Sequence, residues 1–305
     1  MRFEPEVQDW LDSGGWPLHV IGQRMIERAQ HEPACSYRWC IYDVVRGTRH
    51  AFNEHARVPA SSTRKLYILV AVLLLIEHGE LALSDSVVVD NQKAGVQTCG
   101  GLWLLDSPRA FTVAELLKLM MGLSDNVATF YLVDLLGLER LNALSTVFGL
   151  SGTWHLSAVP SQALTADHPL SAVNTTTASD LVTALSILVE GANSRLSAGG
   201  AFIRRELCEF GLNSMRAQQD TTAIRSWLTD VDQVGDKHGI GYRNYNNVAY
   251  LAHGGAVRII FSIIVDDLHC IESPMPAFAH ARDFIALFSR LLDDYTRLEY
   301  PSKEL

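Results

Sequence analysis

The sequence predicts an α/β (α+β) fold of two lobes, in which an antiparallel sheet flanked by helices meets an all-helical lobe. Strand patterns occur only near the two ends of the chain, and helical patterns fill its long middle. The 305 residues with 48% hydrophobic content suffice for a large core. Strands from both ends pair most simply in one sheet, which leaves the middle as a separate lobe. A cleft between two such lobes is a natural place for a small-molecule site.

The two ends of the chain supply the predicted α/β lobe. A helix is expected at 16–30, and two strand-rich runs follow it on either side of "RGTR". Runs of β-branched and aromatic residues around a Gly-containing turn are typical of a hairpin. Strand patterns return at "VDQVGDKHG", "NNVAYLA" and "AVRIIFSIIV", and a terminal amphipathic helix is expected over 276–297.

Helix-boundary signals mark the middle of the chain. The segment "FTVAELLKLMMGL" opens with Thr112 and Glu115 at capping-box spacing. The next two helical patterns end at Gly137 and Gly149, and glycine commonly follows the last turn of a helix. Residues 151–174 show little periodicity and are expected to form a long loop.

Helices resume after this loop. Thr175 or Thr176 is a suitable N-cap for "ASDLVTALSILVEG", and another helix is expected over 201–212. The lobe boundaries follow from this order of elements. The predicted lobes are 1–60 together with 214–305 (the α/β lobe) and 61–213 (the helical lobe).

Charge and hydropathy narrow the class of partner. With 34 acidic and 25 basic residues the net charge is −9, which makes nucleic acids and anionic membrane surfaces poor partners. The longest apolar run, Leu66–Ile76, is too short to span a bilayer. The N-terminal stretch "MRFEPEVQDWLDSGGW" lacks the apolar core of a secretory signal, so a cytoplasmic location is expected.

The cysteines do not follow a metal-binding or disulfide framework. There are five of them, an odd number without metal-ligand spacing: Cys35, Cys40, Cys99, Cys208 and Cys270. We therefore expect reduced, mostly buried thiols and no bound metal.

The clearest chemical pattern is "SSTRK" at 61–65, directly before the apolar run "LYILVAVLLLI". Ser62 and Lys65 are three residues apart and share a face of a helix. A Ser hydroxyl is a weak nucleophile until a neighbour takes its proton, and burial beside another cation would lower the pKa of the lysine and provide a neutral amine. Alone this pattern is weak, because a Ser-x-x-Lys match arises about once by chance in a chain of this length.

Two further tripeptides strengthen the pattern. "SDN" at 124–126 lies between two helical patterns, where Asp125 is also an ordinary N-cap candidate. "KHG" at 237–239 lies in a predicted strand. The tripeptide "KAG" at 93–95 also fits Lys-x-Gly, but it precedes "SDN" and lies in irregular sequence, so we reject it.

This ordered set resembles the active-site motifs of class A β-lactamases and penicillin-binding proteins. The flanks "VPASSTRKLYIL", "GLSDNVAT" and "VGDKHGIG" are similar to that family, as are "NTTTASDLV" at 174–182 and the interval between the two serines. The resemblance covers nearly the whole chain. It implies a serine β-lactamase-like fold, with the active site between the lobes and no metal or organic cofactor.

The resemblance also implies roles for the motif residues. Ser62 would be the acylated nucleophile with Lys65 as its proton acceptor, and Ser124 would pass a proton to the leaving group. Lys237 would attract a substrate carboxylate and help to keep Lys65 neutral. Asn126 would hold the amide of the acyl side chain.

Further positions would complete the cleft. The backbone N–H groups of Ser62 and Ile240 would form an oxyanion hole, and Gly239 would belong to the substrate-binding strand. Trp103 is a candidate for an aromatic wall, and Arg243 for a second carboxylate-binding cation. A core Trp and a surface Arg are the alternatives.

The chain departs from the family pattern at two places. Class A β-lactamases carry a Glu that activates the deacylating water in the loop before the position of Asn174, whereas "SAVPSQALTADHPLSAVN" contains none. The expected position falls near Ser161 or Gln162, neither of which is a carboxylate base, so slow deacylation is expected. His238 stands where the family usually has Thr or Ser, and its imidazole would bind a different carboxylate or serve as the water-activating base.

Three other groups in or near the loop are candidate bases. They are His155, Asp167 and His168, for which a capping, solvated or structural role is the alternative. Asp167 is the only acid in that stretch, and it lies too close to Asn174 to match the missing Glu.

The sequence therefore predicts a class A β-lactamase-related serine hydrolase. It would be acylated on Ser62 by β-lactams, or by related amides and esters with a carboxylate, and would deacylate slowly. Two alternatives stay open: a cytoplasmic esterase, amidase or acyltransferase of natural-product metabolism, and a non-turnover β-lactam sensor. The missing Glu favours the sensor, whereas Lys65, Ser124 and Lys237 favour an enzyme. A small molecule is the expected partner, and the oligomeric state is not predicted.

Overall fold

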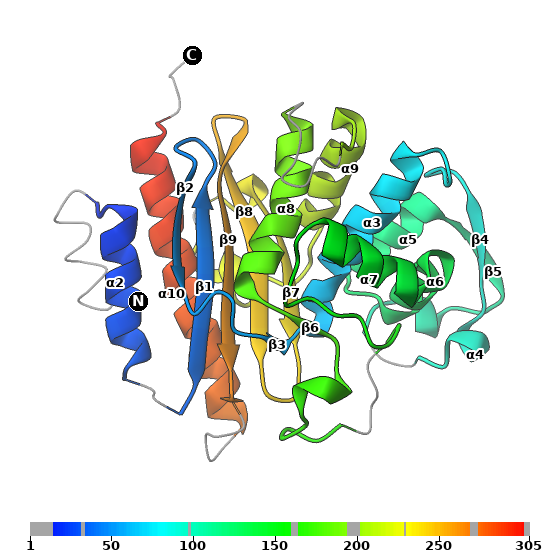
Figure 1. The fold of residues 1–305 in the computed structure, drawn as a ribbon, viewed down its shortest axis with the longest axis horizontal. Coiled ribbons are helices and arrows are strands. Elements are labelled where there is room, and N and C mark those ends of the chain that lie inside the picture. Colours follow the sequence, from blue (N-terminus) through cyan, green and yellow to red (C-terminus); the bar gives the residue numbers. More distant parts are fainter. Residues whose placement is uncertain are drawn as a thin grey trace.

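The centre of the fold is a five-stranded antiparallel sheet of order β2-β1-β9-β8-β7 (Figure 1). The first two strands come from the beginning of the chain and the other three from its end, as predicted, and β7 lies at an edge of the sheet. The strands are β1 (Ser36–Asp43), β2 (Thr48–Phe52), β7 (Val234–Ile240), β8 (Tyr245–His253) and β9 (Ala256–Asp266). The computed structural model describes residues 15–31, 34–96, 99–159, 164–193, 202–228, 230–268 and 274–301.

Helices cover both faces of this sheet because successive side chains of a strand point to opposite sides. On β1, Trp39 and Ile41 belong to the core formed with α2 and α10, whereas Cys40 between them belongs to the core formed with α8 and α9. Figure 1 shows α2 and α10 on one side of the sheet and α8 and α9 on the other. The four helices are α2 (Leu18–Ala29), α8 (Ala178–Ala192), α9 (Arg205–Arg216) and α10 (Pro274–Glu299).

The apolar run after the Ser62 motif forms α3, which is buried on every side. Each residue from Lys65 to Ile76 is buried, because α5, α6, α7, α8 and α9 all pack against this helix. Its first turn is thereby held rigidly. The helices of the helical lobe are α3 (Lys65–Glu77), α4 (Asn91–Ala94), α5 (Val113–Gly122), α6 (Asn126–Leu136) and α7 (Leu138–Val147).

Most helix boundaries follow the signals in the sequence. Thr112 and Glu115 form the predicted capping box at the start of α5, and α6 ends directly before Gly137. The helix expected over 201–212 is shifted, because α9 begins only at Arg205. The small two-stranded sheet of β4 (Ser86–Val89) and β5 (Arg109–Thr112) was not predicted.

The cap of α8 differs from the prediction. The Thr177 hydroxyl, and not that of Thr175 or Thr176, accepts a hydrogen bond from the Asp180 N–H. The prediction is wrong because Thr175 and Thr176 form a strand that pairs with Val58 and Pro59. The remaining short elements are β3 (Val58–Pro59), β6 (Thr175–Thr176) and the 3₁₀ turns η1 (Ser61–Arg64), η2 (Leu102–Leu104), η3 (Leu170–Ala172), η4 (Ile224–Trp227) and η5 (Val231–Gln233).

The two-lobe architecture predicted from the sequence is thus present, while the boundaries 1–60, 61–213 and 214–305 stay a prediction. In the predicted loop 151–174 the residues 160–163, which include Ser161 and Gln162, lie outside the described part of the chain. Among the helices that the structure describes, none combines the length and the apolar character needed to cross a bilayer.

Candidate active site

Ser62 lies where the chain turns from the sheet lobe into α3. It belongs to η1, in which Ser61 has a positive φ of 46°. The Thr63 hydroxyl donates to the Ala60 carbonyl at 2.6 Å and tightens this turn. As a result Ser62 lines a cavity directly in front of the buried helix.

Lys65, the first residue of α3, lies on the same side of the helix as Ser62. Its Nζ is 3.3 Å from the Ser62 Oγ, 3.0 Å from the Ser124 Oγ and 2.6 Å from the Ser124 carbonyl oxygen. A fourth contact, of 2.8 Å, joins it to Oδ1 of Asn126. Burial, and secondly the charge of Lys237, lower the pKa of Lys65 well below its ordinary value. A neutral amine at this place is able to accept a proton from either hydroxyl.

The "SDN" segment connects α5 to α6. Ser124 has a positive φ of 54°, which turns its hydroxyl and its carbonyl toward Lys65. Asp125 caps α6 through the Ala128 N–H and also accepts hydrogen bonds from the N–H groups of Gly101 (2.7 Å) and Leu102 (2.9 Å). Asp125 is therefore the predicted N-cap, and in addition it ties this connection to the segment before η2.

The edge strand β7 lies against η1. A Cβ added to Gly239 would be 2.7 Å from the Thr63 nitrogen and 2.8 Å from the Ser62 nitrogen, so only glycine permits this approach. Lys237 is fully buried, and its Nζ donates to the His238 carbonyl at 2.8 Å. Burial lowers the pKa of Lys237 to about 8. The third motif thus lies beside Ser62 and supplies a buried charge near Lys65.

His238 has a partner that the sequence did not reveal. Its Nδ1 lies 3.4 Å from Oδ2 of Asp220, and both side chains are partly exposed. Burial first, and then the charge of Lys237, lower the pKa of His238 to about 3, so the imidazole is neutral. Asp220 precedes η4 in a connecting segment and belongs to no motif, so no signal in the sequence pointed to it.

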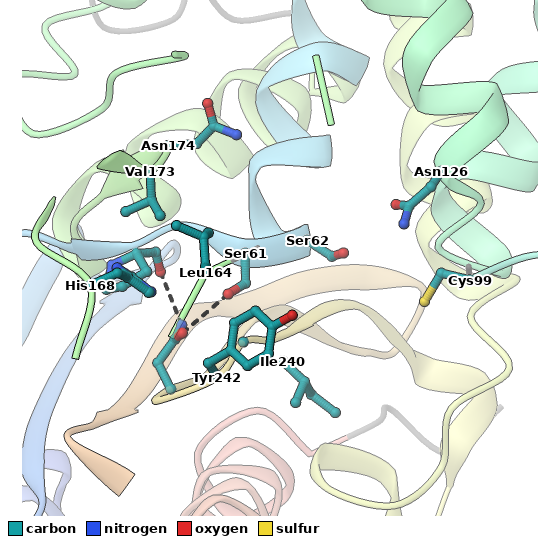
Figure 2. A pocket seen from close by; sticks show the side chains of 13 residues that line it. Ser61, Ser62, Cys99, Asn126, Leu164, His168, Val173, Asn174, Ile240 and Tyr242 are labelled. Atoms are coloured by element: carbon teal, nitrogen blue, oxygen red, sulfur yellow. Dashed lines mark hydrogen bonds between the residues drawn. The ribbon is translucent and has the colours of Figure 1, made fainter. Parts of the chain in front are cut away.

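A cavity of about 330 Å³ opens beside Ser62. Figure 2 shows Asn126 and Cys99 on one side of it, and Val173, Asn174 and His168 on the other. Most of its lining surface is apolar, and the apolar residues that line it are Pro59, Leu164, Val173, Ile240 and Tyr242. The cavity is therefore suited to an uncharged, largely apolar group.

Of the predicted binding residues, Asn126 lines this cavity, whereas His238, Gly239, Arg243 and Trp103 do not. The Arg243 guanidinium makes hydrogen bonds of 2.9 and 3.0 Å to Asp266 and one of 2.6 Å to Asp267. Trp103 lies on η2, 37% exposed, and does not line the cavity. The aromatic residue that lines it is Tyr242, which follows the "KHGIG" stretch and was not singled out from the sequence.

The loop that follows α7 and contributes residues to the cavity is bound by the buried side chain of Arg64. The Arg64 Nη1 donates to the carbonyl oxygens of Ser157 (2.6 Å) and Ala158 (2.9 Å). Burial lowers the pKa of Arg64 to about 9. Asn174 fixes the same loop, because its Oδ1 accepts hydrogen bonds from the N–H groups of Leu156 and Ser157. The basic residue between Ser62 and Lys65 thus positions the loop rather than the substrate.

The candidate bases of the loop differ in position. His168 is buried and lines the cavity. His155 is buried against the Tyr67 ring, and burial lowers its pKa well below the ordinary value. Neither His155 nor Asp167 lines the cavity. The described His, Cys, Asp and Glu residues form no group of three or more that could hold a metal ion.

The cysteines are distributed as expected with one exception. Cys35, Cys40 and Cys208 are buried free thiols, whereas Cys99 is exposed and lines the cavity. Cys270 lies outside the described residues.

The geometry can be set beside known proteins. Comparison with curated proteins found no match. Among solved structures, a beta-lactamase from Sphaerobacter thermophilus is 22% identical with a TM-score of 0.74, covering 93% of this chain and 99% of the other. A beta-lactamase from Xanthomonas campestris pv. campestris is 22% identical with a TM-score of 0.74, covering 88% and 97%. A mutant of PBP-A, solved as an acyl-enzyme complex with penicillin G, is 18% identical with a TM-score of 0.74, covering 92% and 98%.

These likenesses confirm the predicted serine β-lactamase-like fold, and at such identities they show the fold alone. A family model described as the beta-lactamase enzyme family matches residues 23–296, which is most of the chain. Fold, motif order and family model agree with one another. The chain therefore belongs to the beta-lactamase enzyme family.

Proposed function

We propose that this protein is a serine hydrolase that opens β-lactams, or related amides and esters, through an acyl-enzyme on Ser62 and releases the acyl group slowly. The observation that carries the proposal is the position of Lys65. It is a buried amine with a lowered pKa, and its Nζ contacts the hydroxyl oxygens of both Ser62 and Ser124. A base that reaches two hydroxyl groups at once is suited to move a proton from one to the other.

Acylation uses these groups in turn. The Ser62 oxygen attacks the substrate carbonyl carbon while Lys65 takes the hydroxyl proton. The N–H groups of Ser62 and Ile240 stabilise the negative charge on the carbonyl oxygen. The bond to the leaving nitrogen or oxygen then breaks, and the leaving group takes a proton from Ser124, which regains one from Lys65. The products are an ester on Ser62 and a protonated leaving group, so the protons balance. The leaving group is a free amine or alcohol from an open-chain amide or ester, and an amine still joined to the acyl group from a β-lactam.

The acyl group would occupy the cavity. Its lining contains Leu164, Val173 and Tyr242, which suit an apolar acyl side chain. Asn126 uses Oδ1 to accept from Lys65, so its amide nitrogen is oriented to donate to a carbonyl of that side chain. This arrangement supports amide-bearing acyl donors with an apolar end.

Deacylation is proposed to be slow because the cavity is poor in bases. No Asp or Glu is among the described residues that line it. Of the four candidate bases, His168 lines the cavity, while Asp167 and His155 do not. His238 is a weak base, since its pKa is lowered to about 3. The base to test first is therefore His168.

Intact-protein mass spectrometry after exposure to penicillins, cephalosporins and simple esters tests the proposal. We expect an adduct on the parent protein and none on the Ser62→Ala variant. A parent protein that forms no adduct with any of these compounds would contradict the proposal.

Turnover separates the hydrolase from the alternatives. A sensor stops after one equivalent, whereas a slow hydrolase continues to release product. The apolar lining of the cavity also favours the other enzyme candidate. This is an esterase, amidase or acyltransferase that reacts with simple acyl donors and with no β-lactam. That reading predicts adducts with the esters alone.

A further inference from the structure

The far end of the cleft is shaped by β7. Side chains two residues apart on a strand point to the same side, so His238 lies on the same side of β7 as Ile240. Ile240 lines the cavity beside Ser62. His238 does not itself line the cavity, but its side chain is partly exposed. Because β7 is the edge strand and Gly239 lies against the Ser62 nitrogen, His238 is in position to contact a part of a substrate that extends beyond the cavity along this edge.

Asp220 places a carboxylate at this position. Its Oδ1 accepts hydrogen bonds from the N–H (2.8 Å) and the hydroxyl (2.7 Å) of Thr222. Its Oδ2 faces Nδ1 of His238 at 3.4 Å. Burial raises the pKa of the Asp220 carboxyl group, but this pKa is lowered overall, and the two hydrogen bonds from Thr222 are the largest of the effects that lower it. Asp220 is therefore ionised at neutral pH.

Three cationic side chains near His238 and Asp220 are bound to other groups. Lys237 is fully buried and donates to the His238 carbonyl. Arg225 is bound to Asp236 at 2.6 Å. Arg243, the predicted second cation, is paired with two carboxylates on and beside β9. The partly exposed charge beside His238 is thus the negative one of Asp220.

The tautomer of His238 follows from this neighbour. Nδ1 faces the Asp220 carboxylate, which favours the proton on Nδ1 and leaves Nε2 as an acceptor. A carboxylate has only acceptors, so it would meet the lone pair of Nε2 and the charge of Asp220. A substrate N–H, O–H or ammonium group would complement both.

We propose that this end of the cleft selects substrates with a hydrogen-bond donor or a cation, and not a carboxylate, on the leaving-group side of the bond that is broken. The inference rests on the proposed function and deepens it, since it names the substrate class. It replaces the expectation, drawn from the sequence, of a substrate that carries a carboxylate at this place. Penicillins and cephalosporins carry a carboxylate on the leaving-group side of the lactam bond, so we expect them to acylate Ser62 more slowly than substrates without one.

A matched set of esters tests the selection. Three phenylacetylglycine phenyl esters differ only at the meta position of the leaving phenol, which carries a carboxylate, a carboxamide or an aminomethyl group. We expect the second and third to acylate Ser62 at least about tenfold faster than the first, which corresponds to one matched interaction against one repulsive one. Phenol release in the first turnover measures each rate.

Two variants assign the effect to its residues. Asp220→Asn should abolish the advantage of the aminomethyl ester over the carboxamide, because it removes the charge but keeps the shape. Asp232→Asn, which removes an exposed carboxylate from the same lobe, should leave the order unchanged. His238→Thr should bring the carboxylate ester to within about threefold of the carboxamide, because a hydroxyl group can donate to it.

The outcomes separate the two proposals. If the carboxylate ester acylates the parent protein as fast as the others, the selection is overturned while the serine mechanism stands. If no ester and no β-lactam acylates Ser62, the proposed function fails. Equilibrium binding of the three esters to Ser62→Ala gives a readout without chemistry, and tightest binding of the carboxylate ester would also overturn the selection.

Discussion

Lys65 is held more closely by Ser124 than by Ser62. Its Nζ is 2.6 Å from the carbonyl oxygen and 3.0 Å from the hydroxyl oxygen of Ser124, against 3.3 Å for the Ser62 hydroxyl. Lys65 is thus held mainly by Ser124 and also contacts the Ser62 hydroxyl. In the proposed mechanism this places the proton acceptor before a substrate arrives, which is the geometry that acyl transfer requires.

Removing the Ser124 hydroxyl should separate this anchoring from the proton relay. In Ser124→Ala the carbonyl contact to Lys65 remains and the relay is lost, so we expect acylation to slow about 10²-fold. Ser124→Gly should acylate as slowly as Ser124→Ala. It should be at least as stable to unfolding as the parent, because glycine accepts the positive φ of 54° without strain. First-turnover rates and thermal melting measure both effects. An acylation rate within threefold of the parent would exclude the relay.

The pH dependence of acylation should be bell-shaped. Lys65 must be neutral, so the rate rises as it loses its proton at a pH well below the ordinary range of a lysine. Lys237 supplies a positive charge beside Lys65 only while it is protonated, so the rate falls as the pH passes about 8. The midpoints of the two limbs are apparent pKa values of the coupled pair Lys65 and Lys237. In Lys237→Arg the alkaline limb should move beyond pH 10, since a guanidinium stays protonated. A limb that stays near 8 would assign it to another group.

Gly239→Ala should damage the nucleophile through its backbone. The added Cβ would lie 2.7–2.8 Å from the nitrogens of Thr63 and Ser62, so η1 must shift. A displacement of about 1 Å at a reacting group costs about 10²-fold in rate. Gly101→Ala is the matched control, because its Cβ would meet only the Leu123 side chain at 3.9 Å. Equal acylation rates for the two variants would show that β7 does not hold Ser62 in place.

Stability should fall in mild acid because of His155. Its pKa is lowered well below the ordinary value by burial, so the unfolded chain takes up a proton near pH 6.5 that the folded protein does not. Stability conferred by the neutral ring is therefore present above about pH 6.5 and is lost as the pH falls. His155→Phe keeps a ring against Tyr67 and removes the titration. We expect the parent to lose up to about 1.4 kcal/mol per pH unit more than this variant below pH 6.5.

Urea unfolding at pH 7.5, 6.0 and 5.0 measures that difference. His55→Gln, which replaces an exposed histidine, is the matched control. His50 and His238 also have lowered pKa values, so part of the acid sensitivity will persist in His155→Phe. If the free energies of unfolding of the parent and of His155→Phe depend on pH in the same way, His155 takes up its proton in the folded protein as it does in the unfolded chain.

The motif residues could be predicted because local chemistry and order along the chain identify them. Ser62, Lys65 and Ser124 follow from spacing on helices and from the resemblance that this spacing supports. Asp220 could not be predicted, because its contact with His238 arises only when a connecting segment packs beside the edge strand. Tyr242 was missed for a similar reason, since which side chain lines a cavity depends on strand register and turn geometry rather than on residue type.

The same limit explains the errors in secondary structure. Thr175 and Thr176 carry a strong capping signal, yet they pair with a segment more than a hundred residues away and leave the cap to Thr177. Arg243 fits a carboxylate site by charge alone, but Asp266 and its neighbour bind it first. In each case a partner distant in sequence decides between two locally acceptable roles.

Asp125 makes one wall of the cleft a single mechanical unit. Its carboxylate holds the N–H groups of Gly101 and Leu102, and the Asn126 N–H donates to the Cys99 carbonyl. These hydrogen bonds join 99–102 to the start of α6, so we expect the two segments to move together. A bulkier acyl group must be accommodated by yielding of the opposite side, at 164–173, so laboratory evolution toward larger substrates should accumulate changes there and leave 99–102 almost untouched.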